Sequence, residues 1–341
     1  MDGQLLLALV VASGAISFTI IVQLIGFLTC ISLARPNLRS SHQEATPQGG
    51  GVGIVAATLL IAGAGSWLSG ALTDEFAILG IAVLGLAAIG AADDIRPLSV
   101  GVRLVAQVLC IGLVVFHTFD ELTLWTGLVF IEGALILLTI LGLWFVNLTN
   151  FMDGLDWLTV AAVTPIAATI SLLGLTENFS VEVAILSCAL LGSLLGFSPF
   201  NRPPARLFLG DVGALSIGLM VFWMLLKLAL VGGVVSAIIF PLYYLADATL
   251  TLARRFLSGE TFWQAHRSHF YQRGHGSGMS ALSVAAYIFT VNCALAGLAA
   301  FSFFQDEITN QLLALAVALG LVAVLLWKFS SYSSPSGTIV Q

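Results

Sequence analysis

Long apolar runs constrain this chain more than any other feature. Eleven such runs, each near the roughly 20 residues that an α-helix needs to cross a bilayer, follow one another with polar joints between them. Hydrophobic residues make up 59% of the 341 residues, and charged residues make up only 9%. No globular surface could hide so much apolar area from water. The sequence therefore predicts an all-α polytopic membrane protein.

The predicted membrane spans divide the chain at regular intervals. They cover residues 4–33, 51–69, 76–92, 102–117, 127–147, 157–175, 180–197, 212–229, 231–252, 281–303 and 311–328. The first run is too long for a cleavable signal peptide, so we expect it to remain as a span. We interpret residues 1–330 as one integral membrane domain and residues 331–341 as a polar cytoplasmic tail.

Basic residues distinguish the two sets of joints between these spans. Eleven of the twelve lysines and arginines fall at one end of the predicted bundle, and only Lys227 lies near the other. The eleven are Arg35, Arg39, Arg96, Arg103, Arg202, Arg206, Arg254, Arg255, Arg267, Arg273 and Lys328. Because basic residues accumulate on the cytoplasmic side, these joints are predicted to be cytoplasmic, with the N-terminus outside and the C-terminus inside. There is no basic block for nucleic acid, so no nucleic-acid partner is expected.

Residues 147–157 concentrate four polar groups directly after an apolar run. They are Asn147, Asn150, Asp153 and Asp156. Carboxylates and amides at the mouth of a membrane helix cost free energy unless they have a use. A helical turn here would bring residues three apart onto one face. Such oxygen ligands suit Mg²⁺, and helix capping is the structural alternative.

Two further acidic sites are predicted on the same face. Asp93 and Asp94 are adjacent, so their repulsion requires partial protonation or a nearby cation, for which Arg96 is a candidate. Asp211 opens the next long span and is well placed as a helix N-cap. A carboxylate at a helix N-terminus could hold a metal ion that binds phosphate.

The last long joint contains a basic segment, which we define as residues 266–275. It carries His266, Arg267, His269, Arg273 and His275. Arginine and histidine offer directional donors to the oxygens of a diphosphate. Zinc binding through His-x-x-His and contact with anionic lipid headgroups are the alternatives.

The remaining polar residues of note lie outside these clusters. The first joint contains Thr46 and the glycine run 49–51, which could cradle a phosphate, but no P-loop lysine follows it. Asp247 lies inside a span, about 10 Å from its end, and is a functional candidate because buried membrane carboxylates are costly. Glu132, Glu182 and Lys227 lie near the outer ends of their spans and are expected to extend towards water.

Four motifs occur in order at the predicted cytoplasmic joints. DDIRPLSVGVRLVAQ begins at Asp93, NLTNFMDGLD at Asn147, PPARLFLGDVG at Pro203 and RRFLSGETFWQAHRSHFYQR at Arg254. This set resembles the polyprenyl-phosphate N-acetylhexosamine-1-phosphate transferases, the membrane glycosyltransferase 4 family, over roughly residues 35 to 280. It looks closest to the bacterial branch that starts O-antigen or related polysaccharides on undecaprenyl phosphate. The His-His-His run typical of the cell-wall translocase branch is absent from the sequence.

The resemblance implies a reaction at the inner membrane. A lipid phosphate attacks the β-phosphorus of a UDP-N-acetyl sugar, sugar-1-phosphate moves to the lipid, and UMP leaves. The implied cofactor is Mg²⁺, with Mn²⁺ as an alternative. By similarity, the catalytic residues are Asp93, Asp94 and Asp211; Asp211 and Asn150 hold the metal, and one of the paired aspartates accepts the proton of the lipid phosphate.

The substrate-binding residues follow from the same resemblance. Asp156 would contact the uracil end, with Asp153 supporting the site. The remaining expected contacts are Thr46, Asn147, His266, Arg267, His269 and Arg273. Two positions depart from the family pattern. Ala214 stands where GD-x-GS has serine, and Trp157 stands where DG-x-DG has its second glycine.

Two functions of other classes are alternatives. One is an ion-coupled secondary transporter with a carboxylate-lined cytoplasmic site, although transporters place such groups near the midplane of repeated halves. The other is a lipid-binding scaffold, which gives no reason for ordered acidic motifs. The sequence leaves open which UDP-N-acetyl sugar is used, whether an aspartate forms a covalent intermediate, and the oligomeric state.

Overall fold

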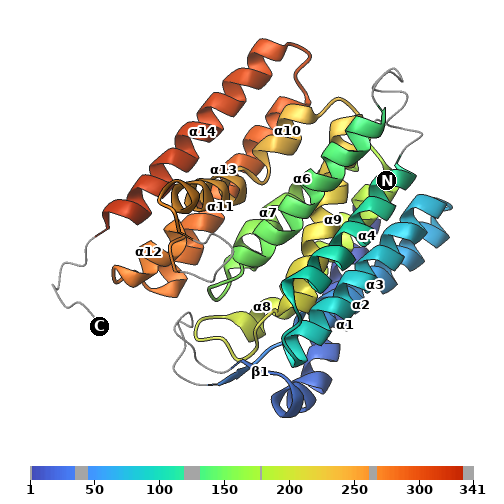
Figure 1. The fold of residues 1–341 in the computed structure, drawn as a ribbon. Helices are drawn as coiled ribbons and strands as arrows, with labels where there is room; N and C mark the ends of the chain where they lie inside the picture. Colours follow the sequence, from blue (N-terminus) through green and yellow to red (C-terminus); the bar gives the residue numbers. More distant parts are fainter. Residues whose placement is uncertain (1, 35–44, 119–130, 177–178, 261–266, 333–341) are drawn as a thin grey trace.

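The computed structural model describes residues 2–34, 45–118, 131–176, 179–260 and 267–332 as a helical bundle (Figure 1). The helices are α1 (Gly3–Ile31), α2 (Gly51–Leu68), α3 (Asp74–Ile95), α4 (Val100–His117), α6 (Ile131–Phe151), α7 (Leu158–Leu173), α8 (Val181–Asn201), α9 (Asp211–Leu230), α10 (Val234–Ile239), α11 (Leu242–Leu257), α12 (Phe270–Gly276), α13 (Ala281–Phe303) and α14 (Ile308–Ser331). Two short strands, β1 (Leu33–Ala34) and β2 (Thr46–Pro47), pair antiparallel.

Nine helices in the described part of the chain are long and apolar enough to cross a membrane. They are α1, α2, α3, α4, α6, α8, α9, α13 and α14. Helix α7 also matches a predicted span but has only 16 residues. The span predicted at 231–252 is divided into α10 and α11 around Pro241, because proline lacks the N–H and clashes with the preceding turn. The polytopic helical fold is confirmed, while the number of eleven spans and the orientation stay predictions.

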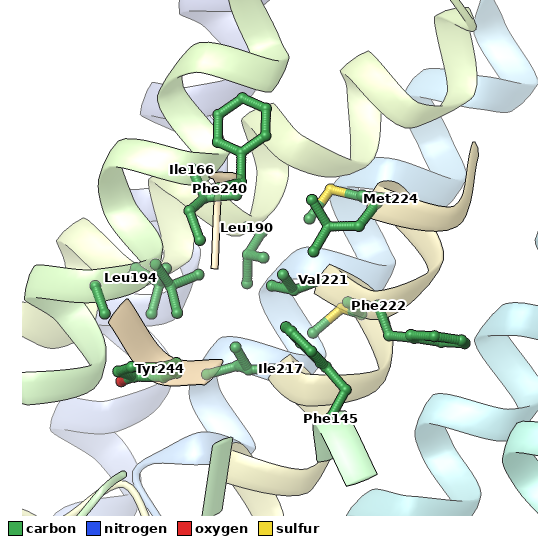
Figure 2. Packing of buried hydrophobic residues seen from close by; sticks show 14 of the residues in the cluster. Phe145, Ile166, Leu190, Leu194, Ile217, Val221, Phe222, Met224, Phe240 and Tyr244 are labelled. Atoms are coloured by element: carbon green, nitrogen blue, oxygen red, sulfur yellow. The ribbon is translucent and has the colours of Figure 1, made fainter. Parts of the chain in front are cut away.

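Helix α9 forms the centre of the bundle. Residues 212–228 are buried, and the helix packs against α2, α3, α6 and α10. Figure 2 shows apolar side chains of α9 packed against those of its neighbours. Ile217, Val221, Phe222 and Met224 come from α9, and the others labelled are Phe145, Ile166, Leu190, Leu194, Phe240 and Tyr244. Lipid tails are as apolar as these side chains, so helix association in a membrane depends on close van der Waals packing.

Glycines bring two neighbouring helices against the start of α9. A Cβ atom on Gly51 of α2 would collide with the backbone of Gly213, and one on Gly90 of α3 with the backbone of Asp211. The backbone N–H of Gly51 also donates to the carbonyl oxygen of Leu209 at 2.8 Å. The glycine run 49–51 therefore serves close helix packing, whatever further role it has.

Two charged residues at the opposite end differ from the prediction. Glu182 and Lys227 are both 7% exposed, so they do not extend towards water. The Nζ of Lys227 lies 3.0 Å from Oε2 of Glu75, and Glu182 accepts the backbone N–H of Thr73 at 3.0 Å. A buried charge needs such partners, and the bundle supplies them between helices. Glu132 is exposed, as predicted.

The joints that carry the motifs lie together at one end of the bundle, the lower end in Figure 1. The first joint runs beside the joint after α8. Gln48 forms a bridge with Phe208, and the backbone N–H of Phe208 donates to the carbonyl oxygen of Pro47 at 2.9 Å. Two segments far apart in the sequence are thereby fixed next to the start of α9.

Candidate active site

Asp94, at the end of α3, binds the start of α9. Its Oδ1 accepts the backbone N–H of Asp211 at 2.9 Å, and its Oδ2 accepts that of Val212 at 3.2 Å. A helix N-terminus leaves such N–H groups without partners inside the helix, and a carboxylate there also matches the helix dipole. The predicted N-cap role of Asp211 is wrong by one position, because α9 begins at Asp211 and Gly210 is the N-cap. The capping carboxylate comes from Asp94 instead.

Asp93 and Asp211 share one arginine. The Nη1 of Arg103 lies 3.0 Å from Oδ2 of Asp93 and 3.5 Å from Oδ2 of Asp211. Asp93 also accepts the backbone N–H of Leu98 at 2.6 Å. The expected cation beside the paired aspartates is therefore present, and it is Arg103 rather than the candidate Arg96. A guanidinium can serve two carboxylates because its donors point in fixed, separate directions.

Asn150 reaches the same carboxylates from a third helix. It lies near the end of α6, and its side chain is a hydrogen-bond partner of the Asp211 carboxyl group. Asp93 also contacts that carboxyl group. Asp93, Asn150 and Asp211, predicted from separate motifs, are therefore neighbours in space. The ends of α3 and α6 and the start of α9 bring them together.

Residues 147–157 do not form one continuous helical face. Helix α6 ends at Phe151, and α7 begins at Leu158. Asn147 and Asn150 share a helix, whereas Asp153 and Asp156 lie in the turn that follows. The amide nitrogen of Asn147 donates to Oε1 of Gln107 at 2.7 Å. This contact joins α6 to α4, and the substrate-binding role of Asn147 stays a prediction.

Asp153 is held inside the turn by Thr159, whose hydroxyl donates to its Oδ1. The pKa of Asp153 is raised to about 8, chiefly by burial, with smaller contributions from the nearby carboxylates of Asp211, Asp94 and Asp156, while the Thr159 hydrogen bond opposes the rise. The neutral acid is favoured because several negative charges are crowded in a poorly solvated place. The protonated form of Asp153 is thus favoured by its surroundings.

Asp156 and Trp157 join the turn to the joint after α8. Oδ2 of the buried Asp156 accepts the backbone N–H of Ala205 at 2.9 Å. The indole N–H of Trp157 donates to the carbonyl oxygen of Ser198 at 2.7 Å, and its backbone N–H donates to Oδ1 of Asn201 at 2.8 Å. Trp157 has φ 63°, the left-handed region that favours glycine. This explains why glycine suits the position in the family pattern, and it shows what holds a tryptophan there.

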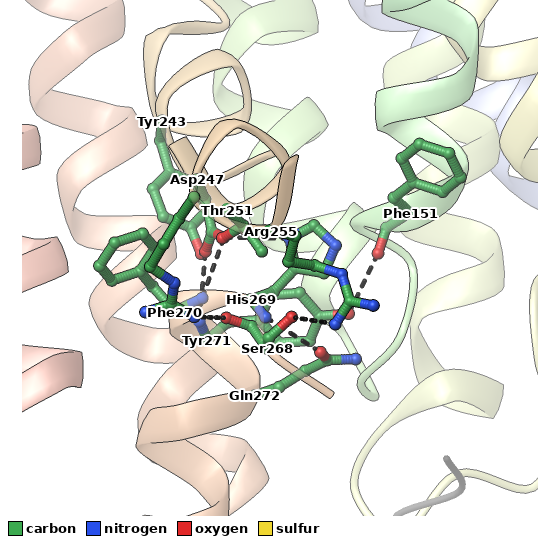
Figure 3. A network of polar contacts seen from close by, with 11 residues as sticks. Phe151, Tyr243, Asp247, Thr251, Arg255, Ser268, His269, Phe270, Tyr271 and Gln272 are labelled. Carbon is green, nitrogen blue, oxygen red and sulfur yellow. Dashed lines mark hydrogen bonds and ion pairs between the residues drawn. The ribbon is translucent and has the colours of Figure 1, made fainter. Parts of the chain in front are cut away.

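Asp247 organises the basic segment. It is completely buried in α11, and five donors surround its carboxylate (Figure 3). They are the backbone N–H groups of Phe270 and Tyr271, Nδ1 of His269, and the hydroxyls of Tyr243 and Thr251. His269 itself is 3% exposed and stacks on Tyr271.

The other predicted residues of the basic segment differ in exposure. Arg267 is exposed, and Arg273 is half-buried with its guanidinium 5.7 Å from the ring centre of Phe270. His266 lies outside the described residues. His275 binds the carbonyl oxygen of Met279 at 2.9 Å. Their contacts with a diphosphate stay predictions.

Thr46 lies in β2 and is buried. Its neighbour Gln48 donates to the backbone carbonyl of Asp94 at 2.8 Å, and Ser32 donates to the same oxygen at 3.0 Å. We call Asp93, Asp94 and Asp211 the carboxylate cluster. The first joint is therefore adjacent to this cluster. The role of Thr46 at a nucleotide stays a prediction.

Arg103 and Tyr271 were not predicted as site residues, although both stand inside the quoted motifs. Arg103 lies ten residues after Asp93, in the first turn of the next helix. A short joint between two helices keeps the end of the first and the start of the second at the same end of the bundle. This spacing is the signal that could have identified Arg103. Tyr271 donates its hydroxyl to the carbonyl oxygen of Phe151 at 3.1 Å. Nothing in its local sequence indicates that partner.

The side-chain oxygens at this site are of the type that Mg²⁺ binds. Among the described residues, no three His, Cys, Asp or Glu side chains converge as a metal cage. Mg²⁺ does not need such a cage, because it commonly binds one or two protein oxygens together with water and substrate phosphate. Asp211 and Asn150 are neighbours, and each carries a side-chain oxygen of the kind that Mg²⁺ binds.

Comparison with known proteins identifies similar sequences. A family model described as "Glycosyl transferase family 4" matches residues 76–229. The match contains Asp93, Asp94, residues 147–157 and Asp211, and it ends before the basic segment. The carboxylate cluster thus lies within the part of the chain that the family model describes.

Three relatives extend the likeness beyond that range. A phospho-N-acetylmuramoyl-pentapeptide-transferase of Shouchella clausii is 31% identical over 220 residues, which cover 57% of this chain and 67% of the relative. A decaprenyl-phosphate N-acetylglucosaminephosphotransferase of Mycolicibacterium smegmatis is 25% identical over 339 residues, covering 86% and 81%. A probable undecaprenyl-phosphate N-acetylglucosaminyl 1-phosphate transferase of Bacillus subtilis is 27% identical over 258 residues, covering 72% and 70%.

Proposed function

Since the chain belongs to glycosyl transferase family 4, we propose that it transfers N-acetylhexosamine 1-phosphate from a UDP-sugar to undecaprenyl phosphate and releases UMP. The observation that carries this proposal is the meeting of Asp93, Asn150 and Asp211 at one end of a membrane bundle. The lipid-diphosphate sugar would start O-antigen or related cell-envelope polysaccharide synthesis. We place the enzyme in the bacterial inner membrane with these joints in the cytoplasm.

The substrates follow from the names of the relatives and from the physics of the site. Two relatives are named for a decaprenyl or an undecaprenyl phosphate and an N-acetylglucosamine phosphate. A polyprenyl chain requires an enzyme inside the bilayer, and a nucleotide sugar requires a polar mouth. N-acetylglucosamine is the first sugar to test. N-acetylgalactosamine and the 6-deoxy sugars N-acetylfucosamine and N-acetylquinovosamine follow.

The reaction joins two anions, so the site must offset their repulsion. An oxygen of the lipid phosphate bonds to the β-phosphorus, and the bond from that phosphorus to the oxygen bridging the two phosphates breaks. Asp211 and Asn150 would hold Mg²⁺, which when bound neutralises charge on the diphosphate. Arg103 lies between Asp93 and Asp211 and can turn its donors to a phosphate that enters there.

Protons and leaving group are assigned to the same residues. We assign the proton of the lipid phosphate to Asp93. One of its oxygens is bound by Arg103, and an entering phosphate can take over that arginine and leave the oxygen to accept the proton. Asp94 holds α9 in place through two backbone N–H groups. Arg267 and Arg273 would donate to the phosphate oxygens of the departing UMP, where charge develops. Asp156 would face the uracil ring from the buried end of the turn.

The transporter alternative has no observation in its favour. Its carboxylates would be expected near the membrane midplane, whereas Asp93, Asp94 and Asp211 lie at helix ends. The named relatives above are transferases. We therefore propose the transferase function alone.

UMP release by the purified full-length protein tests the proposal. The assay contains Mg²⁺, undecaprenyl phosphate and each UDP-N-acetyl sugar in turn. Asp211→Ala is expected to lower turnover at least 100-fold while the protein remains folded, because a metal-binding oxygen is lost. Glu132→Gln changes an exposed carboxylate at the far end and serves as the matched control. Full activity of Asp211→Ala would refute the metal role, and no UMP with any sugar would refute the function.

A further inference from the structure

Asp247 is the most buried carboxylate of the described chain that the proposed reaction does not use. Its residue is 0% exposed, and its two oxygens receive five hydrogen bonds. A carboxylate has about four acceptor sites, so no room is left for a substrate. Burying a carboxylate costs several kcal/mol unless it is fully hydrogen-bonded. The role of Asp247 therefore lies in the protein groups that its carboxylate binds.

What Asp247 holds is the beginning of α12. The backbone N–H groups of Phe270 and Tyr271 donate to it at 3.0 Å and 3.2 Å, and Nδ1 of His269 lies 3.2 Å away. These three residues are consecutive and come from the basic segment, whereas Asp247 belongs to α11. One side chain thus fixes both the backbone and the imidazole where α12 begins (Figure 3).

Tyr271 passes this constraint to the carboxylate site. Its side chain is completely buried, and its hydroxyl donates to the carbonyl oxygen of Phe151 at 3.1 Å. Phe151 directly follows Asn150. Gly154 leaves the space for this contact, since a Cβ atom there would collide with the Tyr271 hydroxyl. Helix α12 is thereby seated against the turn that carries Asp153.

We propose that Asp247 is a positioning residue that fixes the basic segment against residues 151–154 and thereby sets the affinity for the nucleotide sugar. The inference rests on the proposed function, because it takes Arg267 and Arg273 as donors to the diphosphate. Asp247 acts through His269 and Tyr271 and touches no substrate. The bond from Tyr271 to Phe151 joins α12 to the end of α6, the helix that carries Asn150.

Kinetics of Asp247→Asn provide the first test. The variant keeps one acceptor oxygen and loses the charge, so α12 is held less firmly while its shape is retained. We expect the KM for the UDP-sugar to rise about tenfold and the KM for undecaprenyl phosphate to stay within twofold. A role in stability alone would lower the active fraction and kcat without changing either KM. An unchanged KM for the UDP-sugar overturns the inference.

Two further variants separate positioning from folding. Tyr271→Phe keeps every bond to Asp247 and removes only the contacts of the hydroxyl with Phe151 and Gly154, and it should raise the same KM with no more than a small change in Tm. Thr251→Val removes the longest contact of Asp247, at 3.4 Å, and is the matched control with unchanged kinetics. If Asp247→Asn does not fold, Tyr271→Phe alone decides, and a normal KM for the UDP-sugar overturns the inference.

Trypsin cleavage after Arg273 tests the link without turnover. In the purified full chain, Asp247→Asn should be cut there at least fivefold faster than wild type, because α12 is released, while Thr251→Val should match wild type. Equal cleavage rates in wild type and Asp247→Asn overturn the inference. A wild-type protein that releases no UMP refutes the proposed function and the effect on KM with it, whereas the cleavage rates still decide whether Asp247 anchors the segment.

Discussion

Replacing Asp94 by alanine should weaken the attachment of α9 to the end of α3. Two backbone N–H groups lose their acceptor, and hydrogen bonds to a charged group contribute about 1.5–3 kcal/mol each. Asp211 is half-buried, so water replaces part of its loss, whereas Val212 is buried, and the lower value for each bond therefore gives a minimum. The free energy of unfolding should fall by about 3 kcal/mol. At about 2–4 °C per kcal/mol, Tm falls by about 6 °C or more.

Asp93→Asn is the matched control for this prediction. It keeps an oxygen for the backbone N–H of Leu98 and loses only the ion pair with Arg103, whose side chain is 31% exposed. Such partly exposed pairs contribute at most about 1 kcal/mol, so Tm should fall by no more than about 4 °C. Thermal unfolding in metal-free detergent solution measures both variants. Equal Tm values for Asp94→Ala and Asp93→Asn would refute the assignment of Asp94 as the cap of α9, whatever happens to activity.

Two further predictions concern residues 153–157. Because the pKa of Asp153 is raised to about 8, the folded protein keeps a proton that the unfolded chain loses near pH 4, and stability falls as pH rises between these values. The fall in Tm from pH 5.5 to pH 8 should be smaller in Asp153→Asn; the same fall in both proteins would contradict the raised pKa. At Trp157, φ 63° favours glycine, so Trp157→Gly should be more stable than Trp157→Ala by about 1 kcal/mol, measured as Tm. If Trp157→Ala instead had the higher Tm, this turn would not hold its left-handed conformation.

The membrane bundle and the end at which the motifs gather were predictable from the sequence. The thickness of a bilayer fixes the length of each apolar run, and polar joints must leave the membrane. Asp93, Asn150 and Asp211 follow or open such runs on one face, and the structure brings them together. The repulsion between Asp93 and Asp94 predicted partial protonation or a nearby cation, although not that Arg103 supplies the cation.

Individual partners could not be predicted, because they depend on the rotation and packing of helices. Asp93 and Asp94 are identical in sequence terms, yet one faces Arg103 and the other caps α9, since successive residues of a helix point in different directions. The prediction for Lys227 was wrong for a related reason. Its position along the helix was correct, but whether a neighbouring helix offers Glu75 is a matter of packing.

The glycine contacts at the start of α9 have a consequence for how such a protein can diverge over evolutionary time. Gly51 and Gly90 place bare backbone against backbone, so any larger side chain there would displace Asp211 together with its whole helix. Variation that leaves the carboxylates in place must therefore accumulate elsewhere, in loops that can change length and composition without moving α9. The same fold can thus acquire new substrates while its carboxylates are inherited as one unit.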